Sequence, residues 1–149
     1  MPVEKINGIT MSWDVAGEGE PMLFFPGLGT GKGYYRLGEP ILRRDFQTIL
    51  IDPRGIGESI TDQAEFVTED WADDAAALLD HLGIAKAHIV GSSHGGCMAL
   101  ALADRHPEKV GSLILIGAFT ELDRLIEMNF RFRIKLVRKL GMGEEIADH

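Results

Sequence analysis

A serine flanked by glycines, at the point where an apolar run gives way to a helical one, is the first feature of this sequence that suggests chemistry. Residues 91–95 read Gly-Ser-Ser-His-Gly and match the pattern Gly-x-Ser-x-Gly, with Ser93 at the centre. The apolar run 87–90 predicts a strand before the pattern, and residues 97–105 predict a helix after it. Such a turn strains the serine backbone, and the helix N-terminus offers free N–H groups to a developing oxyanion. The pattern therefore predicts that Ser93 is a nucleophile.

Ser92 is the rival for this role. The register of strand and helix favours Ser93, which lies centrally between Gly91 and Gly95. These two glycines would let strand and helix approach without a clash of Cβ atoms. In the alternative interpretation, the segment is a glycine-rich entry to a helix and its serine is idle.

A second glycine-rich segment, Pro-Gly-Leu-Gly-Thr-Gly-Lys-Gly at 26–33, follows the apolar run 22–25. Its composition indicates a backbone that approaches another group closely. It is not a phosphate-binding loop, because Lys32 is followed by glycine instead of serine or threonine, and it does not match the dinucleotide-binding pattern. We expect the backbone N–H of Leu28 to bind an oxyanion; a plain flexible turn is the alternative.

A polar, glycine-punctuated loop at 52–59 follows another apolar run, 46–51. In open α/β sheets, sites form where strands end in this way. Asp52 and Arg54 resemble catalytic groups by type, but we expect them to brace the loop through local hydrogen bonds.

Alternating apolar runs and helical periodicity predict the remaining elements. The pair Asn7-Gly8 predicts a tight hairpin turn, and Thr68 is expected to be the N-cap of the clearest helix. The stretch 121–140 is amphipathic and basic; such a helix can bind an anionic membrane, but we expect a packed helix with a solvated face. Strands are predicted at 3–6, 9–16, 22–25, 46–51, 87–90 and 113–116, and helices at 34–44, with a break near Gly38 and Pro40, 68–82, 93–105 and 121–140. Strand 9–16 is expected to alternate apolar with smaller or polar residues up to Val15, and strands 22–25, 46–51, 87–90 and 113–116 are expected to be buried.

Composition excludes several classes of protein. The 149 residues carry a net charge of −8, which argues against nucleic acid as a partner. A single cysteine rules out an internal disulfide, and no apolar run is long enough to span a membrane. The N-terminus lacks the apolar core of a signal peptide, so we expect a cytoplasmic protein. No spacing of metal ligands is present, and we expect neither a metal nor a cofactor.

Taken together, the motifs resemble the N-terminal half of the α/β-hydrolase fold, in its esterase, lactonase and enol-lactone hydrolase branch. The matching segments are Pro26–Gly29, Asp52–Ser59, Gly91–Gly96 and Arg105–Val110, in family order and at family spacing. The resemblance runs from about Ile9 to Ala118. It implies an α/β fold with a mostly parallel sheet and flanking helices, cut after about the sixth strand. Residues 1–118 would belong to the core, and 119–149 would begin a helical cap.

The resemblance also implies a mechanism. Ser93 would attack an acyl carbon, and the N–H groups of Leu28 and His94 would hold the oxyanion. The substrate would be a carboxylic ester, a lactone or a related acyl compound. We expect Gly27, Gly29 and Phe119 to line the pocket. A serine nucleophile argues against the related dehalogenases and epoxide hydrolases, which use aspartate here.

The family's histidine, and usually its acid, lie beyond the last residue of this chain. Asp123 is the candidate acid within it. The present histidines are expected to serve other roles: His81 and His106 at helix ends, His88 as a satisfied core residue and His94 beside the pocket, while His149 ends the chain.

Three explanations of the missing histidine stay open. The sequence belongs to a longer hydrolase, to one half of a split enzyme completed by a second half-chain or another copy, or to an inactive truncation. A half-sheet would leave strand 113–116 as an open edge, which favours a missing partner or segment over a monomer of this chain alone. The alternative function is a small-ligand receptor with slow or absent turnover.

Overall fold

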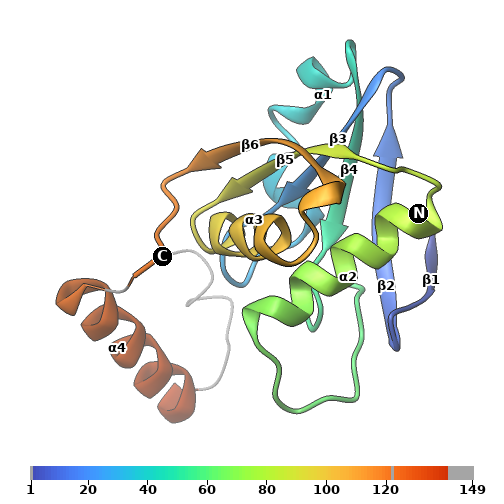
Figure 1. Cartoon of the computed structure of the whole chain (residues 1–149). Helices are drawn as coiled ribbons and strands as arrows, with labels where there is room; N and C mark the ends of the chain where they lie inside the picture. Colours follow the sequence, from blue (N-terminus) through green and yellow to red (C-terminus); the bar gives the residue numbers. More distant parts are fainter. Residues whose placement is uncertain (1, 122, 141–149) are drawn as a thin grey trace. The chain divides into compact units, whose positions relative to one another are not determined.

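The computed structural model describes residues 2–121 and 123–140 (Figure 1). The chain divides into two compact units, residues 1–118 and 119–149. The strands are β1 (Val3–Ile6), β2 (Ile9–Ala16), β3 (Glu20–Phe25), β4 (Phe46–Asp52), β5 (Ala87–Ser92) and β6 (Val110–Ile116). The helices are the 3₁₀ turn η1 (Lys32–Tyr35), α1 (Glu39–Leu42), α2 (Thr68–His81), α3 (His94–Arg105), the 3₁₀ turn η2 (Pro107–Lys109) and α4 (Arg124–Leu140).

The first unit is built on one six-stranded sheet with the order β1-β2-β4-β3-β5-β6. The strands β4, β3, β5 and β6 pair in parallel, while β1 and β2 pair antiparallel at one edge. From β3 the chain moves to the neighbour β4 and then crosses back to β5, on the other side of β3. This confirms the predicted α/β class with a mostly parallel sheet.

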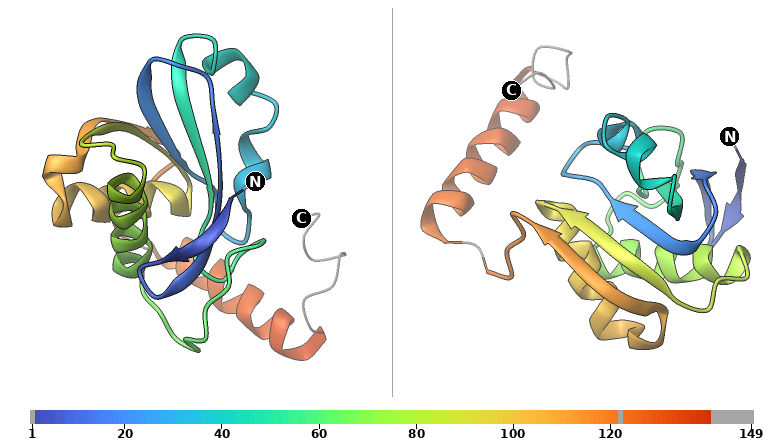
Figure 2. Two further views of the ribbon diagram at one scale, coloured as in Figure 1. Left: turned by 90° about the vertical axis from the view of Figure 1, so that its right-hand side faces the viewer. Right: turned by 90° about the horizontal axis from the view of Figure 1, so that it is seen from above.

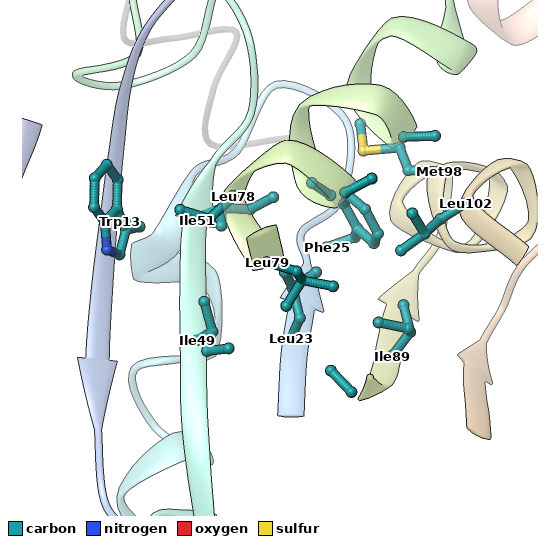
Figure 3. Close-up of a cluster of buried hydrophobic side chains, with 14 of the residues drawn as sticks. Trp13, Leu23, Phe25, Ile49, Ile51, Leu78, Leu79, Ile89, Met98 and Leu102 are labelled. Atoms are coloured by element: carbon teal, nitrogen blue, oxygen red, sulfur yellow. The ribbon is translucent and has the colours of Figure 1, made fainter. Parts of the chain in front are cut away.

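Helices cover both faces of this sheet (Figure 2). The helices α2 and α3 pack on one face over the larger core, in which aliphatic side chains of β3, β4 and β5 meet those of the two helices (Figure 3). Leu23, Ile49 and Ile89 are completely buried there. On the opposite face, Tyr35 of η1 and Leu42 of α1 pack on a smaller cluster that includes Phe24 and Val90.

Local chemistry explains most boundaries of the elements. Asn7 and Gly8 both have positive φ angles, 48° and 79°, as the predicted hairpin turn requires. The helix α2 begins at Thr68, so its N-cap is Val67 and not Thr68 as expected. The reason is Asp70, whose carboxylate accepts the Val67 N–H at 2.7 Å. The predicted helix over 34–44 is only the short pieces η1 and α1, separated at Gly38.

Three expectations about burial were wrong. His88 is not a core residue, because its ring lies half-exposed between Glu20 and Ser112. Val15 breaks the buried alternation of β2 and is 41% exposed. The strand β6 is longer than predicted and largely exposed, with Ile116 at 52%, because among the described residues it pairs only with β5.

The described part of the second unit contains the basic helix α4 as one continuous helix. Asp123 caps it, since its Oδ1 atom accepts the N–H of Ile126 at 2.8 Å. Leu125 and Phe132 are 76% and 62% exposed. No helix within 2–121 or 123–140 combines the length and apolar character needed to cross a membrane.

Candidate functional site

Ser93 occupies the sharp turn between β5 and α3. Its φ and ψ angles are 53° and −121°, a conformation that residues with a side chain rarely adopt. Its backbone holds the turn at both ends: the N–H donates to the Ile116 carbonyl at 2.8 Å, and the carbonyl accepts the Gly96 N–H at 2.9 Å. The side chain is exposed, and its hydroxyl makes no hydrogen bond within the described residues. The predicted strained geometry at Ser93 is confirmed.

The glycines around Ser93 permit a very close approach of backbones. A Cβ atom at Gly91 would overlap the Gly95 carbonyl, and one at Gly95 would overlap the carbonyl oxygens of Phe25 and Pro26. The start of α3 therefore lies directly against the end of β3. Ser92 is buried at 7% exposure, in contrast to Ser93.

The glycine-rich segment after β3 begins with a tight turn. The Thr30 N–H and hydroxyl both bond the Gly27 carbonyl, at 3.2 and 2.7 Å, and Gly29 has a positive φ of 73°. Leu28 lies at the exposed corner of this turn. Its backbone N–H, like that of His94 at the start of α3, donates no hydrogen bond to another described residue.

The sheet brings these two segments to the same edge. β3 and β5 are parallel neighbours, and Phe25 is the register partner of Gly91. From β3 the chain first adds β4 on one side and later adds β5 on the other side of β3. In open α/β sheets, ligands bind at such a switch point in the strand order. Free N–H groups from Leu28 and His94 are thus offered near an exposed serine hydroxyl.

Two adjacent tyrosines, Tyr34 and Tyr35, form hydrogen bonds with residues at the ends of β5 and β3. The sequence analysis did not single them out. The Tyr34 hydroxyl lies 3.0 Å from Ser92 Oγ, and the Tyr35 hydroxyl donates to the Phe25 carbonyl at 2.9 Å. Their rings meet edge to face with centroids 4.9 Å apart. Burial, together with neighbouring Tyr34, raises the pKa of Tyr35, so this phenol stays protonated. Only the tyrosines' place at the end of a glycine-rich loop could have drawn attention to them.

Asp52 braces two loops, as its position in the sequence suggested. Its carboxylate accepts the backbone N–H groups of Lys32 at 2.8 Å and Glu58 at 3.1 Å. The Lys32 ammonium also reaches Ser12 Oγ at 2.6 Å and Glu58 at 2.7 Å. Although burial opposes it, the bond to Glu58 and the charge of Asp52 raise the pKa of Lys32, which therefore acts as a fixed cation.

Arg54 braces its loop locally by donating to Gln63 Oε1, but its main partner is distant in the sequence. Its guanidinium forms a two-pronged ion pair with Asp74 of α2, at 2.7 and 2.9 Å, and both side chains are buried. Its carbonyl accepts the indole N–H of Trp71 at 3.1 Å. The Trp71 ring in turn meets the His94 ring edge to face, with centroids 5.0 Å apart. The buried ion pair of Arg54 and Asp74 is thus linked through Trp71 to His94, the residue next to Ser93.

The burial of His94 disfavours the charged form of its imidazole. Burial lowers its pKa, and its Nδ1 atom is buried without a hydrogen-bond partner among the described residues. The other described histidines are engaged elsewhere. His81 lies 3.4 Å from Glu4, and His106 bonds Asp73 at 2.7 Å. His149 lies outside the described residues.

Two predicted site residues belong to the second unit. Asp123 is occupied in capping α4. The Phe119 ring lies 6.3 Å from that of Phe130. The roles of these two residues as acid and pocket wall stay predictions.

Comparison with known proteins decides the family. A sequence model described as the alpha/beta hydrolase fold matches residues 20–138. The chain belongs to the α/β hydrolase fold family. Among its curated relatives, RutD of Caulobacter segnis, which is named for carbamate hydrolysis, is 33% identical over 95% of this chain and 55% of its own length. The 2-hydroxymuconate semialdehyde hydrolase of a Pseudomonas species is 38% identical over 74% of this chain and 41% of its own length.

A solved esterase from Thermogutta terrifontis, with malate bound, resembles the structure with a TM-score of 0.81 at 31% identity. The match covers 91% of this α/β hydrolase chain and 50% of the esterase. The chain thus spans about half the length of the family members that it matches. These relatives are hydrolases.

Proposed function

We propose that the protein is a serine hydrolase that acts on a carboxylic ester, a lactone or a related acyl compound, with Ser93 as its nucleophile. The observation that carries the proposal is the backbone of Ser93, strained and held at both ends, with an exposed hydroxyl above the N-terminus of α3. Strain of this kind persists where the surrounding structure enforces it, and it clusters at active sites. Ser92, which is buried and bonded to Tyr34, is the weaker candidate.

In the proposed reaction, Ser93 Oγ attacks the acyl carbon while an imidazole takes the hydroxyl proton. The carbonyl oxygen becomes an oxyanion, which the N–H groups of Leu28 and His94 bind. Each donor of this kind contributes about 3 kcal/mol to lowering the barrier. Collapse of the tetrahedral intermediate expels the alcohol, which receives the proton from the imidazole. Water then hydrolyses the acyl-enzyme by the same steps.

We infer that the imidazole comes from outside the described residues. Within 2–121 and 123–140, no side chain bonds the Ser93 hydroxyl, and the neighbouring His94 packs against Trp71. A longer form of the chain, a second half-chain or another copy would supply it. Asp123 is the proposed acid within this chain, and the region 119–149 the proposed start of a cap over the pocket.

The test is the intact mass of the protein after exposure to a fluorophosphonate probe. We expect one equivalent of label in the wild type when a longer form of the chain, a second half-chain or another copy supplies the imidazole, and none in Ser93→Ala under the same conditions. The matched variant Ser92→Ala should still be labelled, because the neighbouring hydroxyl is not the nucleophile. Labelling of Ser93→Ala at the wild-type level would assign the wrong serine.

If the 149-residue chain alone is not labelled, a histidine-bearing second half of a related hydrolase is added to complete the site. A wild type that stays unlabelled after this addition would contradict an activated serine and favour the alternative, a binding protein for small ligands without turnover.

A further inference from the structure

We propose that Tyr34 is a positioning residue of the oxyanion site, which holds the Leu28 turn and the Ser93 turn at a fixed separation. The proposal rests on the proposed function, because it assumes that the N–H groups of Leu28 and His94 act together on one oxyanion. It concerns a residue that no motif in the sequence identifies.

Tyr34 touches both segments. Its hydroxyl lies 3.0 Å from Oγ of Ser92, the residue immediately before the nucleophile. Its ring lies beside Gly27, the residue immediately before Leu28: a Cβ atom at Gly27 would lie 3.7 Å from Cε2 of Tyr34. The Tyr34 side chain therefore bonds the residue before the nucleophile and lies next to the residue before Leu28, a proposed oxyanion donor.

Tyr35 fixes the position of Tyr34 on the sheet. Its ring packs against Phe24 with centroids 4.9 Å apart, and its hydroxyl bonds the carbonyl of Phe25, the last residue of β3. The edge-to-face contact between the two tyrosine rings then orients Tyr34. The short turn η1 is held on the sheet by Tyr35, while Tyr34 extends across to the end of β5.

The burial of the two partners differs in a way that favours a positioning role. Tyr34 is 48% exposed, so its ring contributes little to the core, whereas Ser92 is only 7% exposed. A buried hydroxyl needs a partner, and Tyr34 supplies it from the solvent side. Because Tyr34 is half-exposed, we expect the loss of its hydroxyl to affect the reactivity of Ser93 more than the stability of the fold.

The experiment compares the phosphonylation of wild type and Tyr34→Phe by the same fluorophosphonate probe. This variant removes one oxygen and keeps the ring beside Gly27. We expect the maximal rate constant of labelling to fall about tenfold, because small misplacements of transition-state donors have effects of this size. The probe concentration giving half the maximal rate should stay unchanged, since only the transition state is affected.

Controls separate positioning from folding. Ser112→Ala removes a hydroxyl bonded to His88 at the opposite end of β5 and should leave the rate unchanged. Tyr34→Phe combined with Ser92→Ala should be no slower than the slower single variant, because both delete one bond. The urea midpoint of Tyr34→Phe should stay near that of the wild type; wild-type labelling by Tyr34→Phe, or a rate loss explained by unfolding, would overturn the proposal.

If the wild type is not labelled even after a histidine-bearing second half is added, the proposed function fails, and amide exchange still tests the contact. The Thr30 and Ser93 N–H groups, which bond Gly27 and Ile116, should then exchange faster in Tyr34→Phe than in Ser112→Ala. Equal exchange rates in the two variants would contradict the positioning role of Tyr34, whether or not the protein is a hydrolase.

Discussion

At Gly95, the helix α3 begins so close to the end of β3 that a Cβ atom would overlap two backbone carbonyl oxygens. Backbone atoms at this place cannot give way as a flexible side chain would. Gly95→Ala should therefore lower the free energy of unfolding by about 2–3 kcal/mol and slow labelling of Ser93. Urea unfolding of purified variants measures the first effect.

Gly33→Ala is the matched control, because a Cβ atom there would meet open space and its φ angle is not positive. It should be neutral or slightly stabilising. Equal destabilisation by both substitutions would mean that the loss of glycine, and not the overlap, is responsible.

Residue types and spacing were enough to predict the strained turn at Ser93, because the pattern around it is local in sequence. Tyr34 escaped prediction because its partner Ser92 lies 58 positions away. Arg54 was assigned to its own loop for the same reason: its partner Asp74 lies on a helix that only the folded chain brings alongside.

Between elements, an ion pair joins α2 to α3. Asp73 bonds the Arg105 guanidinium through both oxygens, each at 2.8 Å, and also bonds His106. The bond to Arg105 lowers the pKa of Asp73 below its ordinary 3.8. A carboxyl group with a lowered pKa stabilises the fold above the unfolded pKa and loses that contribution as the pH falls through the folded one.

Asp73→Asn should thus lower the free energy of unfolding by about 1 kcal/mol at pH 7, since the pair is partly exposed. The difference from the wild type should shrink as the pH approaches 3 and falls below it. Asp104→Asn, at an exposed neighbour of Arg105, should change little at either pH. A deficit in Asp73→Asn that is independent of pH would contradict the ion-pair account.

The sequence also predicted each strand of the described residues, yet it misjudged the burial of Val15 in β2, of His88 in β5 and of most of β6. An apolar run such as Leu113–Ile116 indicates a strand, but its burial depends on which strands pair beside it. His88 lies in a similar run and faces Glu20, a residue from a distant part of the chain. Whether a segment forms a strand depends on its local sequence, whereas the burial of that strand depends on the topology of the sheet.

For the molecule as a whole, β6 presents an edge without a paired strand among the described residues, and Ile114, Leu115 and Ile116 are each more than 40% exposed. Exposed apolar edges of this kind pair with other chains. We expect the 149-residue chain to associate increasingly with concentration, and Ile114→Lys to suppress this, as measured by sedimentation velocity.

Leu37→Lys is the control that distinguishes pairing through the β6 edge from non-specific hydrophobic association. Leu37 is 86% exposed but lies in no strand. It should leave association unchanged, and equal suppression by both lysines would argue against pairing through β6.

The bond between the Ser93 N–H and the Ile116 carbonyl has a consequence for the order in which the protein is made. The strained turn is fastened by the last residue of β6, which a ribosome adds well after the serine itself. Until that residue arrives, the nascent chain cannot hold its serine in the conformation described here. The reactive geometry would therefore appear only when the strand next to it is complete, and a partly synthesised chain would carry an ordinary, unreactive serine.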